Sequence, residues 1–440
     1  MERVSDPARD AVTPTRLPRP LRPFRHRDYR LLITSMAASL FATGMWTIAL
    51  VYQVIELGGG PSELSFVMAA MSLGLLLCVL AGGVAADRLP RRAVLIGVEC
   101  TRIVAVGLIA ALSLTGTLSL WVLAAVTFLV GAAEAFFFPA YSALLPTMLP
   151  AEELLAANGV EGMLRPIAMQ ALGPALAGLL VGAFVPGLAL GIAGGVYVLA
   201  LLPLLVMRVA PIEPAAAPTS ALTDLREGFA YFLRTGWLFA TLAFATLLVF
   251  LVIGPIEVLI PFAVRDQAGS GPTGYAFVIA CYGVGGVVGS FVASATRLPR
   301  RYLTVMIMLW GAGTLPLVLI GVTDQLWVMG AASFVVGVTG GAAQVIWGTL
   351  LQRRVPTHML GRVSSLDFFV SLALMPVSMA VAGPVGDAIG IPWTFALAGG
   401  IPVLLAIAAI LGFRLMRDEI AHPLDTSTTE EAAAGPVTAS

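Results

Sequence analysis

The sequence predicts an all-α membrane protein with twelve transmembrane helices arranged as two similar six-helix bundles. Three observations lead to this prediction. Of 440 residues, 58% are hydrophobic and 11% are charged, with a mean hydropathy of +0.94, whereas soluble domains carry about 25% charged residues. Apolar runs long enough to cross a bilayer follow one another along the chain, and one five-residue motif recurs in corresponding loops of the two halves.

The apolar runs define the transmembrane helices, because each bilayer crossing needs about 20 mostly apolar residues. Glycines, prolines and charged residues interrupt the runs and set the boundaries. The predicted spans are 30–54, 63–86, 93–114, 118–146, 158–184, 187–207, 237–263, 273–296, 302–322, 325–351, 362–386 and 391–414.

The segments outside the spans complete the predicted organisation. Residues 1–29 are rich in Arg and Pro and lack the short apolar region of a cleaved signal, so a retained cytosolic tail is expected. The N-terminal bundle covers 30–207 and the C-terminal bundle 237–415. The linker 208–236 turns amphipathic from Leu222 to Leu233, which predicts a helix on the cytosolic membrane face. A disordered cytosolic tail is predicted for 416–440.

The arginines orient these spans in the cell membrane. Short cytosolic loops are enriched in Lys and Arg, and the sequence has no lysine. In the twelve-span arrangement only Arg265 falls on the outer side, so both termini are predicted to be cytosolic. The inner side carries the arginines of the N-terminal tail together with Arg88, Arg91, Arg92, Arg208, Arg226, Arg234, Arg297, Arg300, Arg301, Arg353, Arg354, Arg362, Arg414 and Arg417.

An internal repeat relates the two halves. The motif Arg-Leu-Pro-Arg-Arg at 88–92 recurs at 297–301, after the eighth span. A second set of matches follows at an offset of 206. Two parallel halves of this kind place a substrate site between them, near the bilayer midplane. The second set pairs Phe128, Gly131, Leu144, Leu145 and Pro150 with Phe334, Gly337, Leu350, Leu351 and Pro356.

The loop after the second span carries a recognisable motif: Gly83, Asp87, Arg88, Arg91 and Arg92. This spacing resembles the signature loop of the major facilitator superfamily, although Pro90 replaces the usual glycine. The resemblance implies the major facilitator fold and a cytosolic gate, in which Asp87 binds the start of helix eleven near Gly361. A helix N-terminus favours an anion. The alternative is a positive-inside loop with an incidental acid.

Two further resemblances concern transport direction. In the fifth span Gly173, Pro174 and Gly178 are similar to part of the motif of antiport members, although generic packing of small residues explains them nearly as well. Phe138-Pro139-Ala140, together with Phe24-Arg25 and Tyr29-Arg30-Leu31, resembles the enterobactin and macrolide-type efflux group. The fourth span lacks the arginine of many drug-proton antiporters and has Glu134 in that neighbourhood.

Charged residues inside the spans are candidate sites, because a charge at a helix centre costs roughly 2.5–3.5 kcal/mol. Glu134 is either a protonatable or cation-binding site, or a structural partner of Arg165, which has a similar predicted depth. Glu257 could bind substrate or proton, or could be hydrated near the interface. Proton and substrate coupling is therefore assigned to Glu134, Glu257 and Arg165.

Other charged and aromatic residues have less specific assignments. Glu161 and Asp367 are equivalent in the two halves and are assigned to the cytosolic gate, while Glu99 and Arg102 are expected to form a local pair. A set of residues in spans one, four, seven and ten could form a binding wall, although packing or lipid contact explains any single aromatic better. This set is Trp46, Phe137, Phe138, Phe250, Gln344 and Trp347.

The sequence therefore predicts a transporter that exports small amphipathic molecules, drug-like or siderophore-like, by proton antiport with alternating access. A nutrient uptake symporter is the alternative, and a membrane receptor or enzyme is less favoured because no catalytic constellation is visible. Cys78, Cys100 and Cys281 lie within apolar runs and indicate neither a disulfide framework nor a metal site. No cofactor and no nucleic-acid partner are expected, and the chain is expected to act as a monomer.

Overall fold

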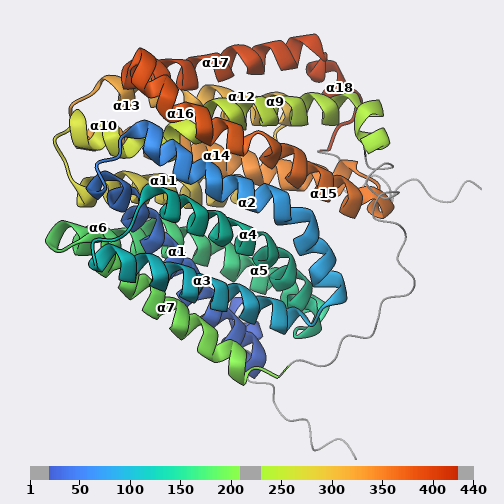
Figure 1. The fold of residues 1–440 in the computed structure, drawn as a ribbon. Coiled ribbons are helices and arrows are strands. Elements are labelled where there is room, and N and C mark those ends of the chain that lie inside the picture. The colour runs from blue at the N-terminus through green and yellow to red at the C-terminus, as the bar shows by residue number, and fades with distance from the viewer. Residues whose placement is uncertain (1–18, 209–228, 425–440) are drawn as a thin grey trace, which may run out of the picture.

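The computed structural model describes residues 19–208 and 229–424, and this part of the chain is helical, without a β-strand (Figure 1). Twelve of its helical segments are long and apolar enough to cross a membrane. The predicted fold class is therefore confirmed. In the view of Figure 1, the helices of the first half lie below those of the second half.

The first half contains seven α-helices and three short segments of other helical types. They are η1 (Arg19–Arg25), α1 (Arg27–Glu56), α2 (Pro61–Arg88), α3 (Arg91–Leu114), α4 (Leu120–Leu144), η2 (Leu145–Thr147), α5 (Ala151–Arg165), the π-helical η3 (Pro166–Leu172), α6 (Gly173–Ala183) and α7 (Pro186–Val206).

The second half repeats this order and adds a short helix after its last span. Its elements are α9 (Gly236–Gly254), the π-helical η4 (Pro255–Leu259), α10 (Ile260–Asp266), α11 (Pro272–Ala295), α12 (Tyr302–Gly311), η5 (Ala312–Thr314), α13 (Leu317–Val322), α14 (Leu326–Arg354), α15 (Thr357–Ala373), α16 (Met375–Ile389), α17 (Ile391–Gly412) and α18 (Leu415–Ala421).

Several spans are broken into two helical segments, and prolines stand at the breaks. Pro166 follows α5, Pro255 follows α9, and Pro376 is the second residue of α16. Proline lacks the N–H that an α-helix needs and its ring clashes with the preceding turn, so it kinks or interrupts the helix. Three of the spans are therefore interrupted at a proline, whereas α11 and α14 are continuous.

Glycines set the closest helix contacts, and they do so at equivalent positions. A Cβ atom on Gly131 of α4 would lie 1.9 Å from the carbonyl oxygen of Met71 in α2. A Cβ atom on Gly337 of α14 would lie 2.1 Å from the carbonyl oxygen of Tyr282 in α11. Both contacts are possible only without a side chain. The repeat found in the sequence is therefore also a repeat in packing.

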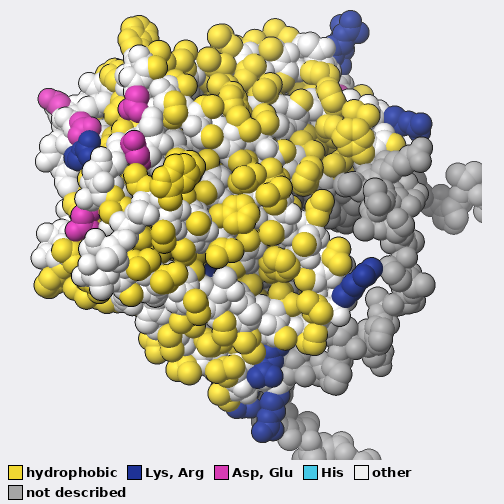
Figure 2. All heavy atoms as spheres, in the orientation of Figure 1, with side chains coloured by type: hydrophobic (Ala, Val, Ile, Leu, Met, Phe, Trp, Pro, Cys, Tyr) yellow, Lys and Arg dark blue, Asp and Glu magenta, His cyan; other side chains and the backbone are white. Residues whose placement is uncertain are grey.

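The two ends of the molecule differ in charge. We call the end where α1 begins the arginine end, because Arg88, Arg297 and Arg353 lie there. The other end, which includes Glu56 and Asp387, is called the acidic end. Figure 2 shows acidic side chains at the left edge, arginines mainly at the right and lower edges, and hydrophobic side chains between them. This apolar band is what lipid tails would contact.

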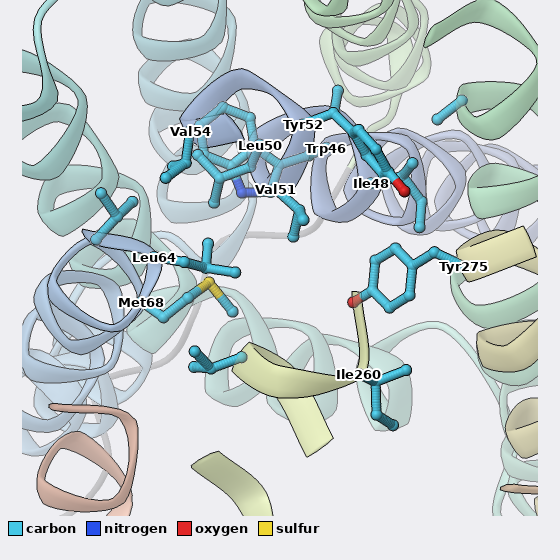
Figure 3. Close-up of a cluster of buried hydrophobic side chains, with 14 of the residues drawn as sticks. Trp46, Ile48, Leu50, Val51, Tyr52, Val54, Leu64, Met68, Ile260 and Tyr275 are labelled. Atoms are coloured by element: carbon cyan, nitrogen blue, oxygen red, sulfur yellow. The ribbon is translucent and has the colours of Figure 1, made fainter. Parts of the chain in front are cut away.

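The two halves are joined at the acidic end. One hydrophobic core there includes residues of both halves, and Tyr52 of α1, Ile260 of α10 and Tyr275 of α11 converge in it (Figure 3). Ser62 donates a hydrogen bond of 2.5 Å to Asp387, and the Gly383 amide donates one of 2.7 Å to Ser65. At the arginine end each half has a separate core. Among the described residues, the core that the two halves share therefore lies at the acidic end.

The segments between and after the bundles differ in part from expectation. Residues 229–234 are helical and include the last part of the linker helix predicted for 222–233, whereas 222–228 lie outside the described residues. The predicted disorder from residue 416 is wrong for 416–421, which belong to α18. Glu419 of this helix is buried and accepts hydrogen bonds from the amides of Leu303 and Thr304 at the start of α12. Composition alone gave no indication of that partner.

Candidate functional site: a central cavity and a buried ion cluster

A cavity of about 1160 Å³ lies between the two halves. The first half contributes residues of α5 and η3, and the second half contributes residues of α9, α11, α12, α14 and α15. Gly159 and Ser294 place one side of the cavity near the arginine end, while the shared core closes the acidic end. The cavity therefore extends from the middle of the molecule toward the arginine end.

The cavity wall is mostly apolar and aromatic, with few charges. Tyr282, Trp310 and Trp347 supply rings, and the charged side chains in its described lining are Arg165 and Asp367. Such a wall with a few polar groups is typical of a small-molecule site. Its size and chemistry suit an amphipathic molecule better than a sugar or an ion.

Only part of the predicted binding wall lines this cavity. Gln344 and Trp347 do so. Trp46 is 2% exposed within the shared core and Phe137 is 5% exposed within the core of the first half, so neither of them lines this cavity. Phe138 is exposed, and the Arg165 guanidinium lies 5.6 Å from its ring centre. Phe250 offers its carbonyl oxygen to Ser378 and is not part of the described lining.

Asp367 lines the cavity and is held there by two hydrogen bonds. The Trp347 indole N–H donates to one carboxylate oxygen at 3.0 Å, and Ser371 donates to the other at 3.4 Å. Within the described part of the chain no Arg, Lys or His forms an ion pair with it. The predicted gate partner, Glu161, has a different environment, because it pairs with Arg165 at 3.5 Å.

The predicted pair of Glu134 and Arg165 is not formed. Glu134 of α4 instead forms an ion pair with Arg102 of α3, and Arg165 pairs with Glu161 one turn earlier in α5. Similar depth along their helices had suggested a pair of Glu134 and Arg165, but depth does not specify the direction in which a side chain points. The assignment of Arg165 as the partner of Glu134 is therefore corrected.

Glu134 belongs to a buried group that we call the ion cluster, made of Glu99, Arg102 and Glu134. Arg102 donates to a Glu99 carboxylate oxygen at 3.1 Å, and the Ser39 hydroxyl of α1 donates to the same oxygen at 2.7 Å. Arg102 also donates to the Ser39 oxygen at 2.7 Å. The expected local pair thus exists, but it is part of a larger set that links three helices.

Aromatic rings enclose the guanidinium of this cluster. The Arg102 guanidinium carbon lies 4.8 Å from the centre of the Phe137 ring and 5.6 Å from that of Tyr197 in α7. The Tyr197 hydroxyl is 3.0 Å from the hydroxyl of Thr43. Cation–π contacts of this kind favour a desolvated cation. Arg102 is consequently held in the centre of the first half.

Glu257 lies in η4, next to the shared core. Its side chain is partly exposed, and it has no hydrogen-bond partner among residues 19–208 and 229–424. The hydroxyls of Tyr275 and Tyr282 are close enough to interact with it electrostatically. Because Tyr282 also lines the cavity, Glu257 lies between the cavity and the seal at the acidic end.

The residues of the signature loop hold helix ends together. Arg91 donates to the carbonyl of Ala143 at 2.8 Å, and Arg92 donates to those of Leu204 and Leu205 at 2.7 Å each. Cations near the C-terminal ends of helices are favourable. Arg88 is exposed, and no atom lies within 4 Å of a Cβ added to Gly83. The Asp87 side chain and the surroundings of Gly361 lie outside the described residues.

The glycines and proline of the fifth span pack against two neighbouring helices. A Cβ on Gly173 would lie 2.4 Å from the Phe41 carbonyl oxygen in α1, and one on Gly178 would lie 2.9 Å from the Ala276 Cβ in α11. Pro174 is buried between them. These small residues therefore bring α6 close to the other half of the molecule.

Comparison with known proteins agrees with this architecture. Residues 19–434 match the family model described as transmembrane secretion effector. The chain belongs to this family of major facilitator superfamily transporters. Macrolide efflux protein A of Streptococcus pyogenes is 24% identical over 84% of this chain and 92% of its own length. Multidrug efflux pump Tap of Mycolicibacterium fortuitum is 28% identical over 86% and 94%.

Solved structures show the same fold. The nucleoside transporter NupG is similar with a TM-score of 0.72 and 14% identity, over 88% of this chain and 99% of its own. A bacterial homolog of the human lysosomal transporter Spinster, described as inward-facing and unoccupied, has a TM-score of 0.66 and 15% identity, over 89% and 98%. The family and its relatives are multi-pass membrane transporters rather than enzymes.

Proposed function

We propose that this transporter exports small amphipathic molecules from the cytosol by proton antiport with alternating access. The observation that carries the proposal is the central cavity, which is apolar, extends toward the arginine end and is closed at the acidic end. Cytosolic loops are rich in arginine, so the arginine end is assigned to the cytosol. The cavity is then in position to receive a molecule from the cytosol or the inner leaflet.

The cavity chemistry favours molecules that combine rings or alkyl groups with a positive charge. Trp310 and Trp347, whose ring centres lie 6.3 Å apart, offer aromatic surface. Asp367 is the acidic group beside them and has no counter-ion in the described chain, whereas Arg165 already pairs with Glu161. A bound cation would supply the missing charge for Asp367 and contact the aromatic faces.

Proton entry is assigned to Glu134, with Glu257 as a second site. The side chain of each is partly exposed, and each lies within the membrane-spanning part of the chain. One charge moving inward at about 100 mV supplies about 2.3 kcal/mol, against about 1.4 kcal/mol for each tenfold concentration gradient. One proton is therefore enough to export a neutral molecule against a gradient of tens-fold. Exchange of one proton for a monovalent cation moves no net charge, so the pH gradient drives it, with about 1.4 kcal/mol for each pH unit.

Asp87, Arg88 and Gly361 are proposed to close the cytosolic side when the cavity opens outward. Arg91 and Arg92 hold the ends of α4 and α7, which keeps the loop attached to the first half. A carboxylate at Asp87 would then be placed to meet the N-terminal half of α15 as the two halves approach.

The test uses everted membrane vesicles energised by a proton gradient and a fluorescent amphipathic cation such as ethidium. We expect protonophore-sensitive uptake into the vesicles, and loss of most cation transport in Asp367→Asn. Asp324→Asn, which changes an exposed acid at the acidic end, is the matched control and should behave as the wild type. Transport that ignores the protonophore, or that runs only out of the vesicles, would contradict the proposal.

A further inference from the structure

The ion cluster contains more acidic than basic groups. Two carboxylates, Glu99 and Glu134, share the one guanidinium of Arg102. The other polar groups against the cluster are neutral: Ser39 and Thr43 of α1 and Tyr197 of α7. With both carboxylates ionised, the centre of the first half would hold an uncompensated negative charge, which a low-dielectric interior disfavours.

The two carboxylates are not equivalent. The Glu99 side chain is completely buried, and its second carboxylate oxygen, Oε2, has no hydrogen-bond partner although it is also buried. The Glu134 side chain is 32% exposed. It precedes Phe138 by one helical turn, so both point to the same side of α4, where Arg165 of the cavity wall meets Phe138. An ionised Glu99 would therefore cost more than an ionised Glu134.

We propose that Glu99 holds a proton in this conformation, and that Arg102 exchanges between Glu134 and Glu99 when the proton moves. The proton passes from the Glu99 carboxyl to the Glu134 carboxylate, which leaves Glu99 ionised and Glu134 neutral. Arg102 stays charged throughout: its hydrogen bond to Glu134 breaks, and it donates instead to the free Oε2 of Glu99. Glu134 then releases the proton to water.

This exchange gives each residue a separate role. Glu134, which is partly exposed, takes up and releases the proton, and Glu99 stores it. Arg102 is a positioning residue whose charge keeps the cluster neutral in both states. Because Arg102 contacts α1, α3, α4 and α7, its movement changes contacts among four helices of the first half. The assignment of this exchange to transport rests on the proposed proton antiport, whereas the protonation of Glu99 does not.

Thermal stability of the purified protein tests the protonation without any transport. Gln has the shape and charge of a protonated Glu, so Glu99→Gln should melt at the wild-type temperature near neutral pH. Glu134→Gln should melt at a lower temperature, because it forces Glu99 to ionise or leaves Arg102 without its partner. Glu152→Gln, an exposed acid of α5, is the control. The reverse order, with Glu99→Gln the less stable variant, would overturn the proposal.

Infrared spectroscopy supplies the second measurement. The wild type should show a protonated carboxyl C=O band that is absent in Glu99→Gln, shifted in Glu99→Asp and unshifted in Glu134→Asp. A band that shifts only in Glu134→Asp would place the proton on Glu134 instead of Glu99 and would overturn the proposal. In vesicles Glu99→Gln should lose protonophore-sensitive ethidium transport and its pH dependence. If wild-type transport ignores the protonophore, the proposed antiport fails, while the melting and infrared results still decide the protonation.

Discussion

The two halves of this transporter share their packing but not their charges. Gly131 and Gly337, 206 residues apart, make the same close contact with a neighbouring helix. The ion cluster has no counterpart in the second half, since its three positions are occupied there by uncharged residues. At offsets of 209, 209 and 206, Glu99, Arg102 and Glu134 correspond to Met308, Gly311 and Gly340.

The glycines that both halves share and the charges that only one half has serve different tasks. The glycines are retained in both halves because they set helix distances that the fold needs. The three charges of the ion cluster occur in one half, because a buried charge costs free energy and serves only a specific purpose. Most of the cavity lining comes from the second half, so substrate contacts and proton handling are assigned mainly to different halves of the molecule.

The halves also differ at the arginine end. In the first half Arg91 and Arg92 bind carbonyls at the ends of α4 and α7. In the second half the additional helix α18 performs the connection: Glu419 binds the start of α12, and Asp418 binds Arg354 of α14 at 2.5 Å. The same end is thus held by cations at helix C-termini in one half and by acids from α18 in the other.

Arg102→Met should lower the stability of the protein more than the other variants, because it removes the only cation of the ion cluster. Breaking a buried pair by removing one partner costs roughly 3–5 kcal/mol. We expect a much lower melting temperature and yield, measured on purified protein. Gly311→Ala at the equivalent place in the second half disturbs packing against α17 and against Phe244 of α9, and it should retain the coupling of transport to protons.

The double variant Arg102→Met with Glu134→Gln tests whether Glu99 is protonated. It leaves a protonated Glu99 and no charge in the cluster, so the melting temperature should recover, while proton coupling should not. A double variant as unstable as Arg102→Met alone would show that Glu99 is ionised and would contradict the assignment.

The sequence predicted the fold better than the site. Hydropathy, the arginine distribution and the repeat were enough for twelve helices in two halves, because each depends on local composition. The contact of Arg102 with Glu134 depends on the rotation of α3 relative to α4, which depth along each helix does not contain. The sequence likewise does not specify the direction in which Trp46 points, because an aromatic ring suits a core as well as a cavity wall. The role of α18 depends on Glu419 meeting α12, a contact between distant segments.

Gly131→Ala and Gly337→Ala should have similar, intermediate effects, because packing is what the halves share. The added methyl groups would lie 1.9 Å and 2.1 Å from backbone carbonyl oxygens, so the helices must separate. Overpacking of this kind costs about 1–3 kcal/mol, measurable by thermal melting. Gly340→Ala is the control, since no atom lies within 4 Å of its added Cβ. A large loss in only one of the two halves would break the comparison.

Ser65→Ala tests the seal that joins the halves at the acidic end. It removes the acceptor of the Gly383 amide, which donates at 2.7 Å in a buried contact between α2 and α16. The lost hydrogen bond is worth about 1 kcal/mol, and this loss falls on the sealed conformation. We expect single-cysteine probes near the cavity to become more accessible from the acidic side. Unchanged accessibility would show that the shared apolar core alone maintains the seal.

Glu419→Gln should have the smallest effect and should be confined to the second half. The carboxylate accepts hydrogen bonds from the Leu303 amide at 3.0 Å, the Thr304 amide at 3.1 Å and the Thr304 hydroxyl at 2.7 Å. Gln retains one acceptor oxygen but loses the charge that favours the positive N-terminus of α12, a difference of about 0.5 kcal/mol. Amide hydrogen exchange should therefore rise at the start of α12 and in α18, with little change in α3, whose N-terminus begins after Pro90 without such a cap. Glu152→Gln at the same end of the first half provides the control. Faster exchange throughout both halves would show that α18 supports the whole molecule, and that the two halves are not held independently at the arginine end.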